Sequence, residues 1–307
     1  MIPPHVTLTH WQEWVEGSAV DPEIASLNLK SLEGTLPYDY LCYSPKIERL
    51  NTGRLPGGIL NRYRHVEDGG WWADGIDVLS GDDSLWGCFK PDHPRDDGEG
   101  KLIKYEHPLK SETEIFALRC PSKVWELVTR RYDVGLPKTY KEAPFSAFWQ
   151  WVIKHPQVPV IVTEGVKKAA AILSCGYVAI GLPGIYSGMR SPKDEFGEND
   201  GDSYLIPQLK AFAQKDRRIY ICFDQDQKHK TVRAVNKAIK KYSWLFKQHE
   251  CEAKIINWHP SFGKGIDDAI VGYGREFFDE VYREAKTFSD WETGQLRQLN
   301  CNPDLLL

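Results

Sequence analysis

Carboxylate side chains follow three apolar segments in the second half of the sequence. These carboxylates are Glu164, Asp224, Asp226, Asp267 and Asp268. A cluster of like charges repels itself unless a cation neutralises it. Oxygen ligands without a neighbouring His or Cys favour a hard ion, Mg²⁺ or Mn²⁺, which commonly bridges one or two carboxylates to a phosphate. The residues therefore predict a divalent-cation site for chemistry at a phosphate.

Each segment taken alone has a structural alternative. A glutamate before Gly165 is also typical of a strand-to-helix turn, where a negative charge near the helix N-terminus is favourable. The Asp-x-Asp segment 224–226 is also typical of helix capping. The joint pattern favours the site, because all three segments follow predicted strands.

The elements that must position these carboxylates alternate between strands and helices. Upstream, the run 101–105 suits a strand after the turn at 96–100. From residue 157 onwards, we expect strands over 158–163, 177–180, 218–223 and 253–258, because these runs are short, apolar and rich in β-branched or aromatic residues. We expect helices over 166–174, 205–214 and 229–248, and a loop over 183–203. This order indicates a mostly parallel sheet with right-handed crossovers. Ligands bind such sheets beyond the carboxyl ends of the strands, where the carboxylates fall.

Four segments in this region resemble the Toprim domain of primases, topoisomerases and related nucleases. They are residues 163–169, 179–184, 222–226 and 264–268, and the resemblance covers 157–275. It implies an α/β fold class, with a Toprim-like, mostly parallel four-stranded sheet flanked by helices and preceded by an α+β N-terminal domain.

The resemblance also implies roles for the carboxylates. Glu164 matches the general acid/base of nucleotidyl transfer, Asp224 and Asp226 match a metal-binding pair, and Asp267 or Asp268 matches a further acidic position. This fits phosphoryl transfer, which requires an ion to offset developing charge and a group to exchange a proton.

Basic and glycine residues beside the carboxylates are candidate phosphate contacts. These candidates are Gly165, Lys167, Lys168, Gly184 and Lys264. Topoisomerases have an acidic residue where Lys167 and Lys168 stand, and the two lysines equally suit a solvated helix turn. No topoisomerase tyrosine domain is recognisable, and the zinc ribbon that precedes bacterial primase cores is missing.

Upstream segments are similar to the Toprim-bearing N-terminal region of cyanobacterial plasmid replication proteins. They are residues 63–72, 86–91 and 103–108. In that family the region precedes a helicase-like portion, so the resemblance implies a helicase module in the same or another chain. The apolar end at 304–307 fits a larger replication protein cut at this point.

Basic residues near aromatic residues in the N-terminal part, and two on one face of the expected helix 229–248, are candidate contacts for single-stranded DNA. The candidates are Arg62, Arg64, Lys90, Lys101, Lys104, Arg233 and Lys237. Nearby Tyr63, Trp86, Phe89 and Tyr105 suit base stacking. The alternative is that the aromatic residues are core and the basic residues are solvated surface.

Composition sets the limits of the prediction. The chain has 307 residues and a net charge of −4, and its seven cysteines include no CxxC pair, which argues against a zinc ribbon. It has no GxxxxGK[ST] loop, so we do not expect ATP-driven helicase activity in this chain. No run approaches the ~20 apolar residues of a membrane span, so we expect a cytoplasmic protein without membrane contact. We predict an α+β N-terminal domain (1–140), a catalytic domain (141–290) and an extension (291–307).

The predicted function is primase-type nucleotidyl transfer on single-stranded DNA, with nucleotides as substrates. The alternatives are a metal-dependent Toprim nuclease and a non-catalytic DNA-binding replication initiator. The sequence leaves open the RNA or DNA nature of the product, the template preference and the oligomeric state.

Overall fold

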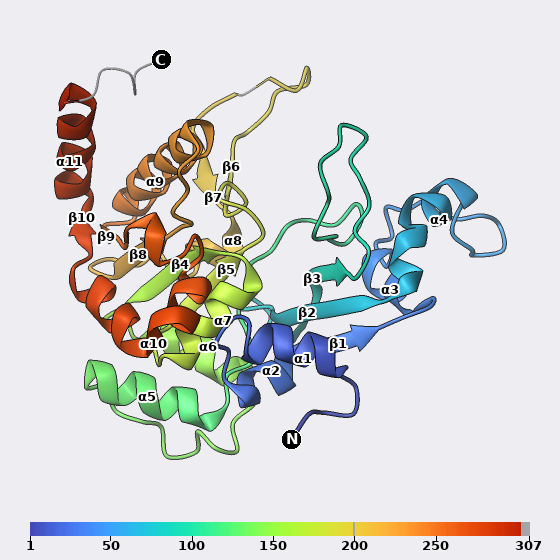
Figure 1. The fold of residues 1–307 in the computed structure, drawn as a ribbon, viewed down its shortest axis with the longest axis horizontal. Coiled ribbons are helices and arrows are strands. Elements are labelled where there is room, and N and C mark those ends of the chain that lie inside the picture. Colours follow the sequence, from blue (N-terminus) through green and yellow to red (C-terminus); the bar gives the residue numbers. More distant parts are fainter. Residues whose placement is uncertain (199, 302–307) are drawn as a thin grey trace.

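The fold places two sheets side by side in a computed structural model that describes residues 1–198 and 200–301 (Figure 1). The strands are β1 (Leu29–Leu32), β2 (Gly70–Ile76), β3 (Asp83–Pro91), β4 (Val160–Glu164), β5 (Ala179–Leu182), β6 (Met189–Arg190), β7 (Tyr204–Leu205), β8 (Arg218–Cys222), β9 (Glu252–Ile255) and β10 (Lys286–Thr287). The α-helices are α1 (Leu8–Val15), α2 (Pro22–Asn28), α3 (Leu36–Leu41), α4 (Gly57–Tyr63), α5 (Ser122–Tyr132), α6 (Ser146–Lys154), α7 (Val166–Ser174), α8 (Pro207–Lys210), α9 (His229–Gln248), α10 (Ile266–Arg283) and α11 (Phe288–Cys301). Two 3₁₀ helices are η1 (Arg64–Asp68) and η2 (Pro260–Phe262). The predicted extension is partly α11, and its residues 302–307 lie outside the described residues.

The larger sheet has the strand order β10-β9-β8-β4-β5. Strands β9, β8, β4 and β5 are parallel, so Val162 of β4 lies opposite Ile180 of β5 and Ile221 of β8. We expected four strands, and the sheet has five, because β10 pairs antiparallel with β9 at its edge. A two-residue strand carries no hydrophobic periodicity, so the sequence gives no signal for it.

Helices cover both faces of this sheet (Figure 1). Tyr220 of β8 stacks on Tyr282 of α10, with ring centroids 4.4 Å apart. Phe223, just beyond β8, lies against Tyr242 of α9 at 5.9 Å. Side chains three positions apart along a strand point to opposite faces, so α10 and α9 cover opposite sides. The carboxyl ends of β4 and β8 stay open between these layers.

The smaller sheet is antiparallel, in the order β1-β2-β3, and β2 separates two hydrophobic cores. Trp71 packs in the large core and Trp72 in the small one, and both are buried. This agrees with the expectation that neighbouring residues of a strand face opposite sides. The large core runs from Val6 to Trp291, so it joins the small sheet to the large one.

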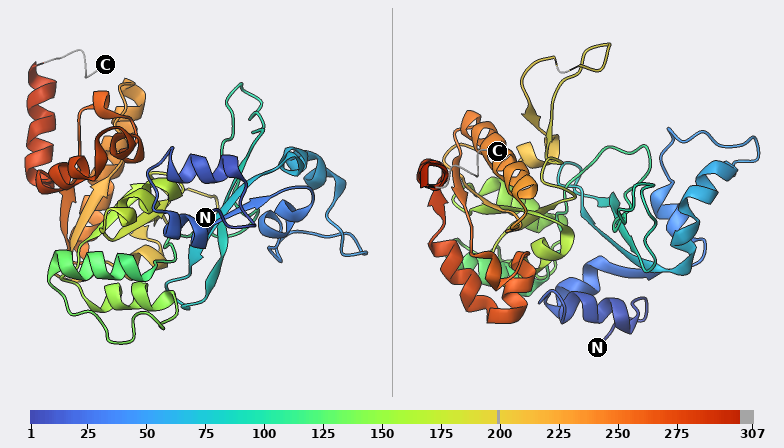
Figure 2. Two further views of the ribbon diagram at one scale, coloured as in Figure 1. Left: turned by 60° about the horizontal axis from the view of Figure 1, so that its bottom comes forward. Right: turned by 45° about the horizontal axis from the view of Figure 1, so that its top comes forward.

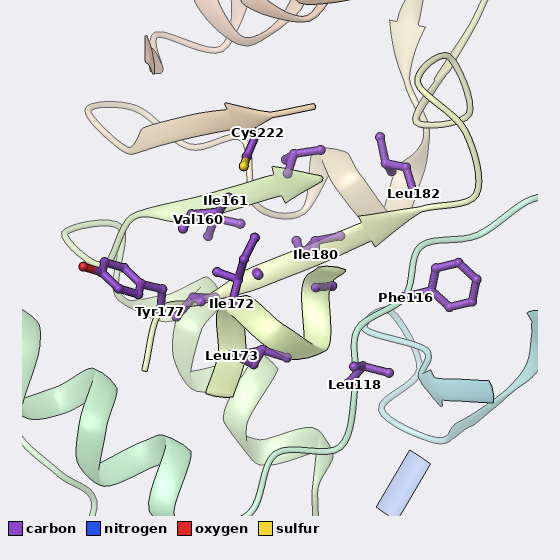
Figure 3. Packing of buried hydrophobic residues seen from close by; sticks show 14 of the residues in the cluster. Phe116, Leu118, Val160, Ile161, Ile172, Leu173, Tyr177, Ile180, Leu182 and Cys222 are labelled. Atoms are coloured by element: carbon purple, nitrogen blue, oxygen red, sulfur yellow. The ribbon is translucent and has the colours of Figure 1, made fainter. Parts of the chain in front are cut away.

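The segment 115–120 connects the two sheets. Phe116 N donates to Gly181 O of β5 at 2.8 Å, and Gly181 N donates back to Phe116 O at 3.0 Å. On the other side, Ile76 N of β2 donates to Ala117 O at 2.8 Å. Figure 3 shows Phe116 and Leu118 on this segment beside β5 and α7. Residues of the N-terminal part are thereby held at the open edge of the large sheet.

Three expected elements differ from the structure. The run 101–105 is not a strand: apart from an isolated antiparallel bridge between Leu102 and Asp96, its residues lie in a loop after the turn at 96–100. The helix expected over 205–214 is the shorter α8. The expected loop 183–203 carries β6, which pairs with β7 in a ribbon that projects from the body (Figure 2). Among the described residues, no helix is long and apolar enough to cross a membrane.

Candidate active site

Glu164 is the last residue of β4, and the turn after it requires glycine. Gly165 has φ +94°, a conformation that other residues rarely adopt, and its N–H donates to Leu182 O at 2.7 Å. A Cβ on Gly181 would lie 2.8 Å from Gly165 O, so β5 also approaches this turn closely. The turn starts α7 immediately and leaves Glu164 at the open edge of the sheet.

Asp224 follows β8 and pairs with a lysine from the first turn of α7. Lys168 Nζ lies 2.8 Å from Asp224 Oδ1. Burial lowers the pKa of Lys168, but Asp224 and Asp267 outweigh it, so this pKa is raised and the ammonium stays charged. The ion pair therefore joins the Glu-Gly turn to the Asp-x-Asp segment.

Asp226 pairs with the lysine that precedes α10. Lys264 Nζ lies 2.8 Å from Asp226 Oδ2, and Lys264 O accepts from Gln225 N at 2.9 Å. The Lys264 ammonium and the Lys228 N–H lower the pKa of Asp226. Asp226 is therefore held as a carboxylate.

The pKa of Glu164 moves in the opposite direction. Burial raises the Glu164 pKa, the Asp224 carboxylate raises it further, and Lys168 and Lys264 oppose the shift only in part. This edge of the sheet thus holds one firmly ionised carboxylate, Asp226, and one carboxyl group, Glu164, that protonates more readily. Such a separation is typical of acid–base sites.

Two adjoining cavities open at this edge. The aromatic cavity, of about 360 Å³, is lined by Tyr105, His107, Phe116, Glu164, Lys168 and Asp224, among others. The lysine cavity, of about 290 Å³, is lined by Lys167, Lys168, Asp224, Lys264, Asp267 and Asp268, among others. Lys104, Gly165 and Lys264 line both cavities. The structure thus brings together Glu164, Gly165, Lys167, Lys168, Asp224, Lys264, Asp267, Asp268 and Lys104 from the predicted set.

Some predicted residues at this edge have structural partners. Asp268 Oδ2 accepts from Gly265 N at 3.0 Å and caps α10, and Asp267 Oδ2 accepts from Ser18 Oγ at 3.1 Å. Lys167 Nζ lies 2.9 Å from Glu13 Oε1. Gly184 does not line either cavity, nor does Asp226, which faces a small cavity between α9 and α11.

The candidate DNA contacts are dispersed. Arg62 and Arg64 are exposed at α4 and η1. Lys101 is exposed in the loop that follows the turn at 96–100, and Arg233 and Lys237 are exposed on α9. Lys90 Nζ lies 2.8 Å from Glu13 Oε2. Of this set, only Lys104 lines the cavities.

The aromatic residues suggested for base stacking are mostly core. Tyr63 and Phe89 pack in the small core and Trp86 in the large one, and all three are buried. Tyr105 is 39% exposed and lines both cavities. Stacking on bases by Tyr63, Trp86 or Phe89 is therefore wrong, because the helices and strands around them cover their rings.

The donor set matches Mg²⁺ in chemistry. Asp224 and Asp226 offer only oxygen ligands, which suits a hard ion. Within residues 1–198 and 200–301, however, no three His, Cys, Asp or Glu side chains are gathered as a metal-binding group. Each aspartate gives one oxygen to a lysine at 2.8 Å. The lysines thus supply part of the neutralising charge that the sequence pattern assigns to a cation.

Four residues at or behind the site were not predicted as site residues from the sequence. Glu13, Ser18, His107 and Phe116 reach it from the N-terminal part, up to 249 positions away in the chain. Only the aromatic and basic character of 103–108 pointed towards this region.

Comparisons with known sequences give one family match and one longer relative. Residues 148–277 match a family described as "Domain of unknown function (DUF3854)". An uncharacterized protein of Picosynechococcus sp. is 48% identical over 301 residues, which are 97% of this chain and 29% of that relative. The chain therefore spans less than a third of the length of this relative.

Two solved primase structures are similar in fold. The Aquifex aeolicus primase, with its zinc-binding and RNA polymerase domains, aligns with a TM-score of 0.51 and 14% identity over 95% of this chain and 59% of that chain. The DnaG primase catalytic domain bound to ssDNA aligns with a TM-score of 0.51 and 10% identity over 96% and 76%, respectively. The chain therefore has a primase-like fold.

Proposed function

We propose that the chain is a Toprim-type, metal-dependent nucleotidyltransferase that synthesises primers on single-stranded DNA. The observation that carries the proposal is one cavity, in a primase-like fold, that gathers Glu164, Asp224, Lys168 and Lys264 at the carboxyl ends of β4 and β8. Carboxylates and ammonium groups at such an edge suit phosphoryl transfer.

Each group has a distinct role in this proposal. Glu164 exchanges the proton of the attacking or leaving oxygen, which its raised pKa supports. Lys168, Lys264 and the N-terminus of α7 attract the phosphates of the nucleotide. Asp224 and Asp226 hold Mg²⁺ or Mn²⁺, which when bound offsets the charge that develops on the phosphate.

The partners follow from the same proposal. Single-stranded DNA runs past Lys104 and Lys101, and the exposed basic face of α9 with Arg233 and Lys237 provides further backbone contact. Nucleoside triphosphates are the second substrate. Because the Picosynechococcus relative is much longer than this chain, a helicase module in the remainder of such a protein is part of the proposal, as are cytoplasmic placement and a role in plasmid replication.

Synthesis of a primer on a template tests the proposal directly. The chain is incubated with a single-stranded template, NTPs or dNTPs, and Mg²⁺, and product growth is followed on a gel. Glu164→Gln and Asp224→Asn keep the side-chain shape and remove the charge, so we expect turnover to fall by about 10²-fold or more. Glu250→Gln is the matched control, because Glu250 pairs with Lys215 on the exposed surface, outside both cavities.

The other outcomes identify the alternatives. Shortening of the template in place of product growth assigns the same residues to a nuclease. The lysine pairing of Asp224 and Asp226 favours one further candidate, a DNA-binding initiator without catalysis. Binding of DNA that neither substitution changes, with no turnover, would establish that candidate and overturn the proposal.

A further inference from the structure

The histidine in the aromatic cavity has one ring nitrogen left over for a ligand. His107 stacks on Trp86, with centroids 5.1 Å apart and an interplanar angle of 3°. Its Nδ1 lies 2.9 Å from Gly87 O. A carbonyl oxygen only accepts, so Nδ1 carries the hydrogen of this bond. Burial lowers the pKa of His107, so the ring is neutral and Nε2 is an acceptor.

No donor from the described residues reaches this Nε2, although His107 lines the cavity. A neutral, oriented imidazole in the wall of a cavity offers one directional hydrogen bond to whatever enters. The stacking on Trp86 fixes the ring plane, so the direction of that bond is preset.

Part of the wall of this cavity is apolar and aromatic, besides its charged residues. Phe116, Tyr105, Val166 and Pro183 contribute to it. The volume of about 360 Å³ lies in the range of about 300–1,000 Å³ typical of small-molecule sites. Aromatic walls of this kind bind flat rings through stacking.

The lysines lie where this cavity adjoins the lysine cavity, whereas Glu164 lines the aromatic cavity alone. Lys104, Lys168 and Lys264 line both, while Lys167 lines only the lysine cavity and the aromatic residues Phe116 and His107 line only the aromatic one. One end of the combined space therefore suits a planar heterocycle and the other suits phosphates. A nucleotide has this division of chemistry.

We propose that the aromatic cavity is a nucleoside-binding subsite, which takes the base and sugar of an incoming nucleoside triphosphate while its phosphates reach Lys168 and Lys264. His107 Nε2 accepts a hydrogen bond from the base or the sugar, and Tyr105 and Phe116 flank the base. The assignment rests on the proposed nucleotidyl transfer at Glu164. It adds the residues that hold the nucleoside, which come from the N-terminal part of the chain.

Equilibrium binding without turnover tests the subsite. The full chain is titrated with ATP, dATP and CTP by calorimetry in the absence of template, and separately with an oligo(dT) strand. His107→Phe keeps a stacking ring but removes the acceptor, and we expect nucleotide affinity to fall at least tenfold. Tyr105→Ala tests the same wall from a 39% exposed position, so it carries the test if His107→Phe fails to fold.

His155→Phe is a matched control. His155 also packs on a tryptophan, Trp151, at 4.7 Å, and its Nδ1 lies 2.7 Å from a backbone carbonyl, but it does not line the cavity. Its substitution should leave nucleotide affinity unchanged. Equal loss with His155→Phe would show a general effect of histidine removal and overturn the assignment.

The remaining results separate the subsite from the proposed function. Wild-type affinity for all three nucleotides in both His107→Phe and Tyr105→Ala overturns the subsite, even if Glu164→Gln abolishes primer growth. Weakened binding of oligo(dT) alone assigns the cavity to a base of the DNA strand and also overturns it. Weakened nucleotide binding with turnover that survives Glu164→Gln upholds the subsite and rejects the role proposed for Glu164.

Discussion

At the scale of single residues, lysines and carboxylates neutralise one another at the open edge of the sheet. Lys168 holds Asp224 and Lys264 holds Asp226, each at 2.8 Å. An ammonium group near a carboxylate competes with any divalent cation for the same oxygen and repels the cation as well. The same ammonium attracts phosphate. A lysine in this place therefore weakens metal binding in the absence of nucleotide and strengthens nucleotide binding.

This balance predicts opposite effects of one substitution on two ligands. Lys168→Met removes the charge and keeps most of the stem. We expect the affinity for Mn²⁺ to rise by about 3–10-fold, because the ammonium no longer repels the ion, and the affinity for ATP to fall by a similar factor, because the ammonium no longer attracts its phosphates. A tenfold change corresponds to about 1.4 kcal/mol of binding free energy. Both are measured by calorimetry on the folded variant.

The control for this prediction is Lys215→Met. Lys215 also pairs with a carboxylate, Glu250 at 2.9 Å, but on the exposed surface. It should change neither affinity. An unchanged Mn²⁺ affinity in Lys168→Met would show that Lys168 does not compete with the ion.

The sequence predicts which residues meet at the site where their positions depend only on the order of the strands. Glu164 and Asp224 follow strands, and parallel strands deliver their carboxyl ends to one edge, so their proximity followed from the pattern. The partner of each carboxylate was not predictable. Ser18 meets Asp267 across 249 positions, and that contact depends on how two sheets pack, which no local pattern encodes.

At the scale of elements, α1 is tied to its neighbours through one glutamate. Glu13 Oε2 lies 2.8 Å from Lys90 Nζ of β3 and accepts from Trp71 Nε1 of β2 at 3.1 Å, and Oε1 lies 2.9 Å from Lys167 Nζ of α7. The helix, the small sheet and the helix of the active site thus share one carboxylate. Lys167 and Lys90 are therefore both ion-paired with Glu13.

Glu13→Gln is expected to destabilise the fold in a pH-dependent way. Losing charge-assisted hydrogen bonds costs about 1.5–3 kcal/mol each, less where solvent reaches the pair, so we expect the free energy of unfolding to fall by about 2 kcal/mol at pH 7. Burial raises the Glu13 pKa, but Lys167 and Lys90 outweigh it and leave it lowered. Its contribution is therefore complete above the pKa of unfolded glutamate and is lost as pH falls through the lower folded value.

Urea unfolding at a series of pH values checks this prediction. The difference between wild type and Glu13→Gln should be full at neutral pH and shrink below about pH 4. Glu16→Gln, one turn further along and exposed, is the control and should show almost no difference. A difference that stays constant down to acid pH would contradict the ion-pair explanation.

Which elements the sequence predicts depends on how much local signal each carries. Strand β4 and helix α7 were evident, because an apolar β-branched run precedes a Gly and an alanine-rich helix. The run 101–105 has the right composition for a strand, yet the preceding turn closes on itself through Asp96 and Asp97, which accept from Gly98 N and Glu99 N. That turn leaves little backbone for a ladder, and a short apolar run does not show whether a partner strand exists.

At the scale of the whole molecule, the two sheets form a single structural unit. The large hydrophobic core includes Trp14 and Trp71 of the N-terminal part and Trp258 and Trp291 of the C-terminal part. The segment 115–120 hydrogen-bonds to both sheets through Phe116 and Ala117. The domain boundaries predicted at residues 140 and 290 stay a prediction. The shared core indicates that the predicted domains stabilise one another.

A shared core predicts cooperative unfolding of the full chain. Tryptophan fluorescence, which reports on both parts, and far-UV circular dichroism should give one coincident thermal transition. Gly75→Ala tests the joint, because a Cβ at Gly75 would lie 2.3 Å from Ala117 O and would push 115–120 away from β2. We expect it to lower the free energy of unfolding by about 3 kcal/mol, in the upper range for overpacking, and to shift both probes together.

Gly135→Ala is the matched control, since a Cβ there meets nothing within 4 Å and its φ is not left-handed. It should leave the melting temperature unchanged or raise it slightly, because alanine restricts the unfolded chain. Two separate transitions in the wild type, or a Gly75→Ala shift confined to one probe, would show that the sheets unfold independently. In that case the aromatic cavity, whose walls come from both parts, would be lost when the less stable part unfolds, and nucleotide binding would be lost in that first transition.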